Sequence, residues 1–274
     1  MTATSTPQTT DGVGTAGRAA IDERTLRTDR WWLQPLLTVA GLSAWVIYAL
    51  VRTVTQRAYF VDQYHYLSPF SSPCVSASCA SDARDFGTWF GHFPPFIPFA
   101  ILILPFLLGF RLTCYYYRKA YYRSFWLSPP ACAVAEPHAS YSGETRFPLI
   151  FQNVHRYFFY AALVVSLVNS YDAIRAFRGG DGGFGIGLGT LIMLVNVILL
   201  WAYTFSCHSC RHIVGGRLRN FSKHPLRYRT WTVVSKLNVR HMQLAWTTLG
   251  TLMLTDGYIA LVSANAFNDV RIIN

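Results

Sequence analysis

Long apolar runs alternate with shorter polar stretches along the chain. A helix needs about 20 apolar residues to cross the core of a bilayer, and five runs have roughly this length. The second run holds several prolines, which predict an irregular outer end. The sequence therefore predicts an all-α integral membrane bundle of five transmembrane helices within residues 31–265. The five predicted spans are residues 31–51, 94–112, 147–177, 184–205 and 239–264.

Basic residues are unevenly divided among the stretches outside these runs. Most lie before residue 31 and in the loops 111–146 and 208–240, whereas the intervening loops hold few. Because Lys and Arg accumulate on the cytoplasmic side of a membrane, we predict a cytoplasmic N-terminus and an external C-terminus. Residues 1–30, rich in Thr, Ala and Gly, are predicted to be a disordered cytoplasmic tail, and residues 266–274 an external tail.

Composition supports a membrane protein. Of the 274 residues, 52% are hydrophobic and 14% are charged, against about 25% charged in soluble domains. The net charge of +11 could suggest nucleic acid, but the basic residues are confined to particular loops. Topology explains them better, and we predict no nucleic-acid partner.

Two cysteines lie in the loop that the topology places outside the membrane. Cys74 and Cys79 are five positions apart between the first two predicted spans. An oxidising exterior permits a short disulfide there. The alternative is a pair of free thiols.

A C-x-x-C motif with interleaved histidines stands where the fourth run meets a basic loop. It comprises Cys207 and Cys210, with His208 and His212 between and beside them. Thiolates and imidazoles are the ligands of zinc and of iron–sulfur clusters. The motif therefore predicts a metal or redox site at the cytoplasmic rim of the membrane.

The predicted topology brings two further histidines to this rim. His155 lies near the cytoplasmic start of the third span, and His241 opens the fifth. With Cys207 and Cys210 they make two thiolates and two imidazoles, the ligand set of a Rieske-type [2Fe–2S] cluster. Ionisable residues inside a span are costly and tend to be functional, so we prefer these two histidines as ligands.

Three alternatives stay open at this point. His208 or His212 could replace a helix histidine as ligand. The two cysteines could instead hold a structural zinc. Haem b could be ligated axially by His155 and His241.

The chain as a whole resembles the membrane-anchor subunit of actinobacterial, mycobacterial-type succinate dehydrogenase, respiratory complex II. The resemblance covers most of residues 30–265 and excludes the tail. It is carried by five spans together with the aromatic-basic run Arg111–Arg123, the segment Leu127–Cys132, His155, Cys207 and Cys210.

This resemblance implies a role in a larger complex of the plasma membrane. A flavoprotein subunit oxidises succinate, an iron–sulfur subunit carries the electrons, and the anchor passes them to menaquinone. The anchor itself carries no succinate-oxidising site, and the resemblance implies a Rieske-type cluster in place of haem. The basic, aromatic loops 111–146 and 208–240 suit the docking of acidic faces of the soluble partners.

A quinone requires an apolar slot and a few polar groups for its carbonyls. Trp246 and Asn196 are our candidates, chosen by membrane depth, and Asp256 could help to deliver protons. A hypothesis from another class is a membrane scaffold or transporter with a structural zinc at Cys207 and Cys210. Five unequal spans without an internal repeat argue against it.

Overall fold

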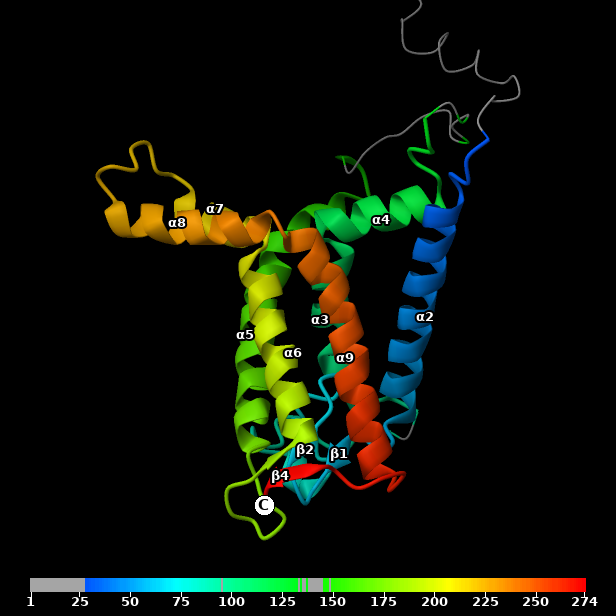
Figure 1. The fold of residues 1–274 in the computed structure, drawn as a ribbon, viewed down its shortest axis with the longest axis vertical. Helices are drawn as coiled ribbons and strands as arrows, with labels where there is room; N and C mark the ends of the chain where they lie inside the picture. Colours follow the sequence, from blue (N-terminus) through cyan, green and yellow to red (C-terminus); the bar gives the residue numbers. More distant parts are fainter. Residues whose placement is uncertain (1–27, 95, 133, 135–136, 138–144, 148) are drawn as a thin grey trace, which may run out of the picture.

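The computed structural model describes residues 28–94, 96–132, 134, 137, 145–147 and 149–274. Helices dominate, and the longest stand side by side along the long axis of the molecule (Figure 1). The predicted tail of residues 1–30 lies almost wholly outside the described residues. The upright helices are α2 (Leu33–Thr55), α5 (His155–Arg175), α6 (Leu188–Phe205) and α9 (His241–Ser263).

The second predicted span is shorter than expected as a helix. Residues 94–112 hold the 3-10 turn η3 (Phe99–Leu102) and the helix α3 (Leu104–Leu112). Proline cannot donate its backbone nitrogen to a helix interior but is accepted in the first turn. Pro98 precedes η3 and Pro105 stands in the first turn of α3, so the prolines set where each helical piece begins.

Among the described residues, three helices are long and apolar enough to cross a membrane: Leu33–Thr55, Leu149–Arg175 and Leu188–Phe205. The second of these includes the 3-10 turn η5 (Leu149–Val154). α3 has nine residues and covers only about 14 Å. α9 has 23 residues, but buried polar residues line one face. The count of five spans and their orientation stay predictions.

Both predicted basic loops contain helices, so their interpretation as loops was wrong. α4 (Tyr115–Phe125) lies within 111–146, and α7 (His208–Gly215) and α8 (Pro225–Asn238) lie within 208–240. These segments mix basic with aromatic or aliphatic residues and contain no long apolar run, which is why hydropathy alone misses them. They lie across one end of the upright helices (Figure 1). We call this end, with α4, α7 and α8, the rim end.

The opposite end, which we call the sheet end, adds short strands to the predicted all-α fold. β1 (Phe60–Val61) pairs with β2 (Tyr66–Leu67), and β3 (Ile186–Gly187) pairs with β4 (Arg271–Ile273), both antiparallel. β4 lies within the predicted external tail of residues 266–274. Its pairing attaches this segment to the start of α6.

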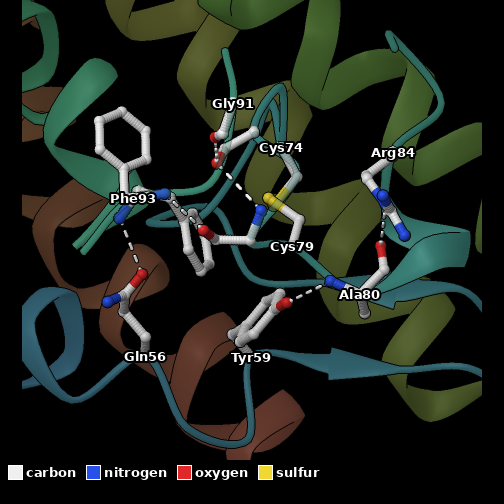
Figure 2. Close-up of a disulfide and its surroundings, with 11 residues drawn as sticks. Gln56, Tyr59, Cys74, Cys79, Ala80, Arg84, Gly91 and Phe93 are labelled. Atoms are coloured by element: carbon white, nitrogen blue, oxygen red, sulfur yellow. Dashed lines mark hydrogen bonds between the residues drawn. A yellow bond between two sulfur atoms is a disulfide. The ribbon is translucent and has the colours of Figure 1, made fainter. Parts of the chain in front are cut away.

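A disulfide joins Cys74 to Cys79 in the segment between α2 and α3 (Figure 2). The Ala80 amide donates to the Tyr59 hydroxyl at 2.7 Å, and the Arg84 side chain donates to the Ala80 carbonyl at 3.3 Å. Both cysteines pack in a small hydrophobic core of their own. The segment is therefore a folded cap at the sheet end.

The helices pack unequally around the core. α6 packs against both α5 and α9, whereas α2 contacts α4 at the rim end and α9 farther along. Toward the sheet end, Tyr48 and Arg52 on α2 bond the Asp256 carboxylate at 2.5 and 2.6 Å. α2 is therefore held mainly near its two ends.

Candidate functional site

Four chemically reactive side chains stand at the beginnings of helices at the rim end. His155 and His241 are the first residues of α5 and α9, and Cys114 and Cys207 are the N-caps of α4 and α7. The first turn of a helix offers free N–H groups and a partial positive charge. These positions therefore suit cysteine thiolates.

His155 is held at both ring nitrogens. Its Nδ1 lies 2.8 Å from Thr113 Oγ1, and its Nε2 lies 3.1 Å from Cys207 Sγ. The Thr113 hydroxyl donates its only hydrogen to the Gly109 carbonyl at 2.6 Å, so toward His155 it can only accept. The Nδ1 atom therefore carries the proton, and the lone pair on Nε2 faces the Cys207 sulfur.

His241 repeats this arrangement with different residues. Its Nδ1 lies 2.6 Å from Ser206 Oγ, and the Ser206 hydroxyl donates to the Tyr203 carbonyl at 2.7 Å. Its Nε2 lies 3.4 Å from Cys114 Sγ. By the same argument, Nδ1 carries the proton and the Nε2 lone pair faces a thiol.

The surroundings of the three buried free cysteines differ. The Cys207 sulfur accepts a hydrogen bond from the Ser209 amide at 3.4 Å, yet burial raises the pKa of Cys207 to about 12. Burial also raises the pKa of Cys114, against the opposing effect of backbone N–H groups in the first turn of α4. The pKa of Cys210 is raised by burial with no such opposing donor. Backbone N–H groups therefore face the sulfurs of Cys207 and Cys114 but not that of Cys210.

Aromatic rings separate the two histidine–cysteine pairs. The His155 ring stacks on Phe110 and the His241 ring on Tyr203, each at 5.0 Å between centroids. Phe110 and Tyr203 meet edge to face at 5.4 Å. A continuous row of rings thus connects the two pairs and helps to exclude water from the site.

The donors stand as pairs rather than as one cluster. Within the described ranges, no three His, Cys, Asp or Glu side chains form a group that could hold a metal ion. The structure brings the predicted Cys207 next to the predicted His155, whereas the contact to His241 comes from Cys114. Cys210 lies buried in the same hydrophobic core.

The other predicted residues fall outside this arrangement. His208 and His212 are exposed on α7. Asn196 is buried nine residues before the end of α6, whereas Trp246 lies five residues into α9, packed on Tyr117 at 6.1 Å. Trp246 and Asn196 therefore lie at different depths.

Cys114 is the residue that sequence reasoning missed. It ends an apolar run and begins a basic, aromatic one, just as Cys207 does. This shared position was a usable signal. The C-x-x-C spacing drew attention to Cys210 instead.

Taken together, the fold is that of a helical membrane protein whose buried thiols and imidazoles gather at one end of the apolar helices. The chain belongs to the family described as actinobacterial succinate dehydrogenase subunit SdhC, whose model matches residues 33–265. The resemblance inferred from the sequence is thus confirmed, and the chain is a membrane subunit of succinate dehydrogenase.

A solved structure supports the same assignment. The chain is similar to one in the Mycobacterium smegmatis Sdh1 complex in the apo form, with 66% sequence identity and a TM-score of 0.89. The match covers 96% of this chain and 99% of the other. No curated protein matches the sequence.

Proposed function

We propose that this chain is the multi-pass membrane anchor and electron-transfer subunit of a succinate:quinone oxidoreductase in the plasma membrane. The flavoprotein and iron–sulfur subunits are its proposed partners, and menaquinone its proposed electron acceptor. Family membership and the similarity to a chain of the Sdh1 complex support this role. Oxidation of succinate is assigned to the flavoprotein subunit and not to this chain.

The distribution of basic residues supports the proposal that the rim end faces the cytoplasm. The helices there carry a high density of arginine and lysine, which accumulate on the cytoplasmic side. The disulfide at the sheet end suits an oxidising exterior. We therefore propose five crossings, by α2, η3 with α3, α5, α6 and α9. The basic residues on α4 and α8 are Arg118, Lys119, Arg123, Arg227, Arg229 and Lys236.

We assign the paired donors at the rim end to a Rieske-type [2Fe–2S] cluster. The observation that carries this is the repeated histidine arrangement: in His155 and His241 alike, Nδ1–H is bonded to a hydroxyl while the Nε2 lone pair faces a thiol. A metal-ligating histidine has this form, because a partner on one nitrogen fixes the other as the ligand. When bound, the cluster supplies one-electron transfer.

Four donors are needed, since a Rieske centre takes two histidines and two cysteines. His155, His241 and Cys207 supply three. For the fourth we favour Cys114, because its sulfur touches His241 and lies beside the first-turn amides of α4. Cys210, predicted from the C-x-x-C spacing, is the alternative.

The surrounding residues hold this site ready for its cofactor. Thr113 and Ser206 fix the orientation of the two imidazoles. The stacked rings of Phe110 and Tyr203 keep water away, which strengthens electrostatic interactions among the polar groups. The basic, amphipathic α4, α7 and α8 offer docking surfaces for acidic faces of the soluble subunits.

The test is iron, sulfide and zinc analysis of the purified whole complex, with EPR of the dithionite-reduced sample. We expect iron and sulfide beyond the soluble subunits' clusters, and a low-average-g signal that is lost in His155→Ala and in Cys114→Ser. Cys132→Ser, at an exposed cysteine, is the matched control and should keep the signal.

Other results would redirect the assignment. Loss of the signal in Cys210→Ser with retention in Cys114→Ser would make Cys210 the fourth ligand, and loss in His208→Ala or His212→Ala would move a histidine ligand to α7. A Soret band that responds to succinate would indicate haem b. Zinc without extra iron would reduce the cysteines to a structural role.

A further inference from the structure

A positively charged side chain is buried beside the proposed cluster site. Arg111 is the penultimate residue of α3 and is only 7% exposed. An arginine so near the end of a membrane helix usually extends its side chain to water, because burial of a charge is costly. Arg111 instead turns its guanidinium into the bundle, and this cost is offset only if something there favours a positive charge.

Neutral groups surround the Arg111 guanidinium. It donates to the Tyr117 hydroxyl at 2.5 Å and to Thr248 Oγ1 at 3.3 Å. No carboxylate in the described part of the chain forms an ion pair with it. The ring of Trp45 lies 5.8 Å away, and its buried indole N–H has no hydrogen-bond partner among the described residues. The positive charge in this region is therefore not neutralised.

This charge lies close to both histidine–cysteine pairs. The guanidinium carbon is 5.1 Å from the centre of the Tyr203 ring, which stacks on His241. The residue before Arg111 in the chain is Phe110, which stacks on His155. Arg111 is therefore next to the side chains that contact both of the proposed histidine ligands.

A buried positive charge at this place favours the gain of an electron. In a centre held by two thiolates and two neutral imidazoles, the charges of two ferric ions, two sulfides and two thiolates cancel. Adding one electron makes the centre negative, and a nearby cation stabilises this state because a buried site screens charge weakly. Arg111 already favours negative charge at Cys114, where it opposes the rise that burial causes in the pKa of the thiol.

From these observations we propose that Arg111 raises the reduction potential of the proposed cluster, an inference that rests on the proposed function. Each electron transfer oxidises a centre of the iron–sulfur subunit by one electron and reduces the site at the rim end by one electron, and no bond forms or breaks. Arg111 stabilises the reduced state through its charge. The site therefore accepts an electron more readily than the same ligands would without this arginine.

The alternative is a structural role, in which Arg111 only joins α3 to α4 and α9. The hydroxyls that it bonds do not depend on it. Tyr117 and Thr248 also donate to the Ala245 carbonyl, at 2.5 and 3.0 Å. Removing the guanidinium therefore leaves neither hydroxyl without an acceptor, and the bond between α4 and α9 stays in place.

The experiment is a redox titration of the purified whole complex, followed through the low-average-g EPR signal. Arg111→Met keeps the length of the side chain without its charge. We expect the equilibrium constant for one-electron reduction to fall about tenfold, equivalent to a midpoint about 59 mV lower. Arg111→Lys keeps the charge and should restore most of this loss. Arg57→Gln, which removes an exposed positive charge at the sheet end, is the control and should leave the midpoint unchanged.

A second variant changes the same charge without removing the arginine. Thr248→Asp places a carboxylate against the guanidinium and should also lower the midpoint. If both variants keep the signal and change the equilibrium constant by less than about twofold, Arg111 does not set the potential.

Iron and sulfide analysis of each variant distinguishes a lowered potential from a lost cofactor. Full iron content with a signal that dithionite no longer produces would mean a strongly lowered potential and would support the proposal. Loss of iron from both variants would mean a structural role instead. Absence of the signal from the unsubstituted complex would overturn the proposed function, and this inference with it.

Discussion

The two ends of the bundle differ in how they hold buried charges. At the sheet end, two of the three buried carboxylates among the described residues have cationic partners: Asp256 bonds Arg52 through both oxygens, and Asp269 bonds Arg271, whereas Asp172 accepts from the Ser72 hydroxyl. At the rim end the only buried formal charge is that of Arg111 among the described residues, and hydroxyls and aromatic faces surround it.

This difference distinguishes buried polar groups that stabilise the fold from buried polar groups that are available to a ligand. A buried charge pair whose hydrogen bonds are all made has few bonding sites left for a ligand, and breaking the pair is strongly unfavourable. At the rim end, several groups remain available to bind a ligand: two imidazole lone pairs, two thiols and an indole N–H. Burying polar groups without partners in an apolar interior is unfavourable unless a ligand binds to them.

Removing one partner of a pair at the sheet end should have the largest effect on stability. Asp256→Asn leaves the Arg52 guanidinium without its charge partner at a largely buried position. We expect the free energy of unfolding to fall by about 3 kcal/mol, measured by thermal unfolding of the complex in detergent. Asp181→Asn, in an exposed loop, is the control. A loss of the EPR signal without a loss of stability would contradict the comparison.

Removing a hydroxyl at the rim end should act on the cofactor rather than on the fold. Thr113→Val deletes the acceptor of His155 Nδ1–H with little change in shape. We expect iron retention against a chelator to fall about 10- to 100-fold, as for other partners of metal-ligating histidines. Thr55→Val loses the same kind of hydroxyl-to-carbonyl bond on α2 and should retain iron normally. Equal iron loss in both variants would rule out this role for Thr113.

The smallest effect should be a pH dependence at the sheet end. His65 is fully buried, and burial, aided by Arg175 and Arg178, lowers its pKa although Asp85 lies 2.8 Å away. Because the folded state favours the neutral ring, its contribution to stability is complete above the ordinary pKa of about 6.5. This contribution decreases as the pH falls toward the lowered pKa.

His65→Gln should therefore reduce the acid-induced decrease in the unfolding temperature, measured from pH 7.5 to 5. His92→Gln, at an exposed histidine, is the control. An unchanged slope in His65→Gln would mean that other groups cause the pH dependence.

Apolar length and charge placement carried much of the prediction. They located the helices around residues 33–55, 155–175 and 188–205, because burial in lipid requires a long apolar run. They could not locate α4, α7 or α8, whose amphipathic sequences contain no such run. The pairing of β3 with β4 joins residues about 85 positions apart, and no local pattern indicates it.

The site was only partly predictable for a similar reason. Depth along the spans was enough to select Cys207, His155 and His241. The contact between Cys114 and His241 depends on where α4 lies across the rim end, which is a tertiary feature. The hydroxyls that orient the histidines were equally hidden, because Thr113 and Ser206 become informative only once their hydrogen-bond partners are known.

The two hydroxyl-bound histidines also bear on how the complex is assembled. Their orientation depends on protein groups alone, so it is established as soon as the helix ends fold. Cofactor insertion then has to order fewer side chains, which lowers its entropic penalty. If the proposed cluster is present, the anchor can thus complete its fold first and serve as a preformed receptor for iron and sulfide delivered afterwards.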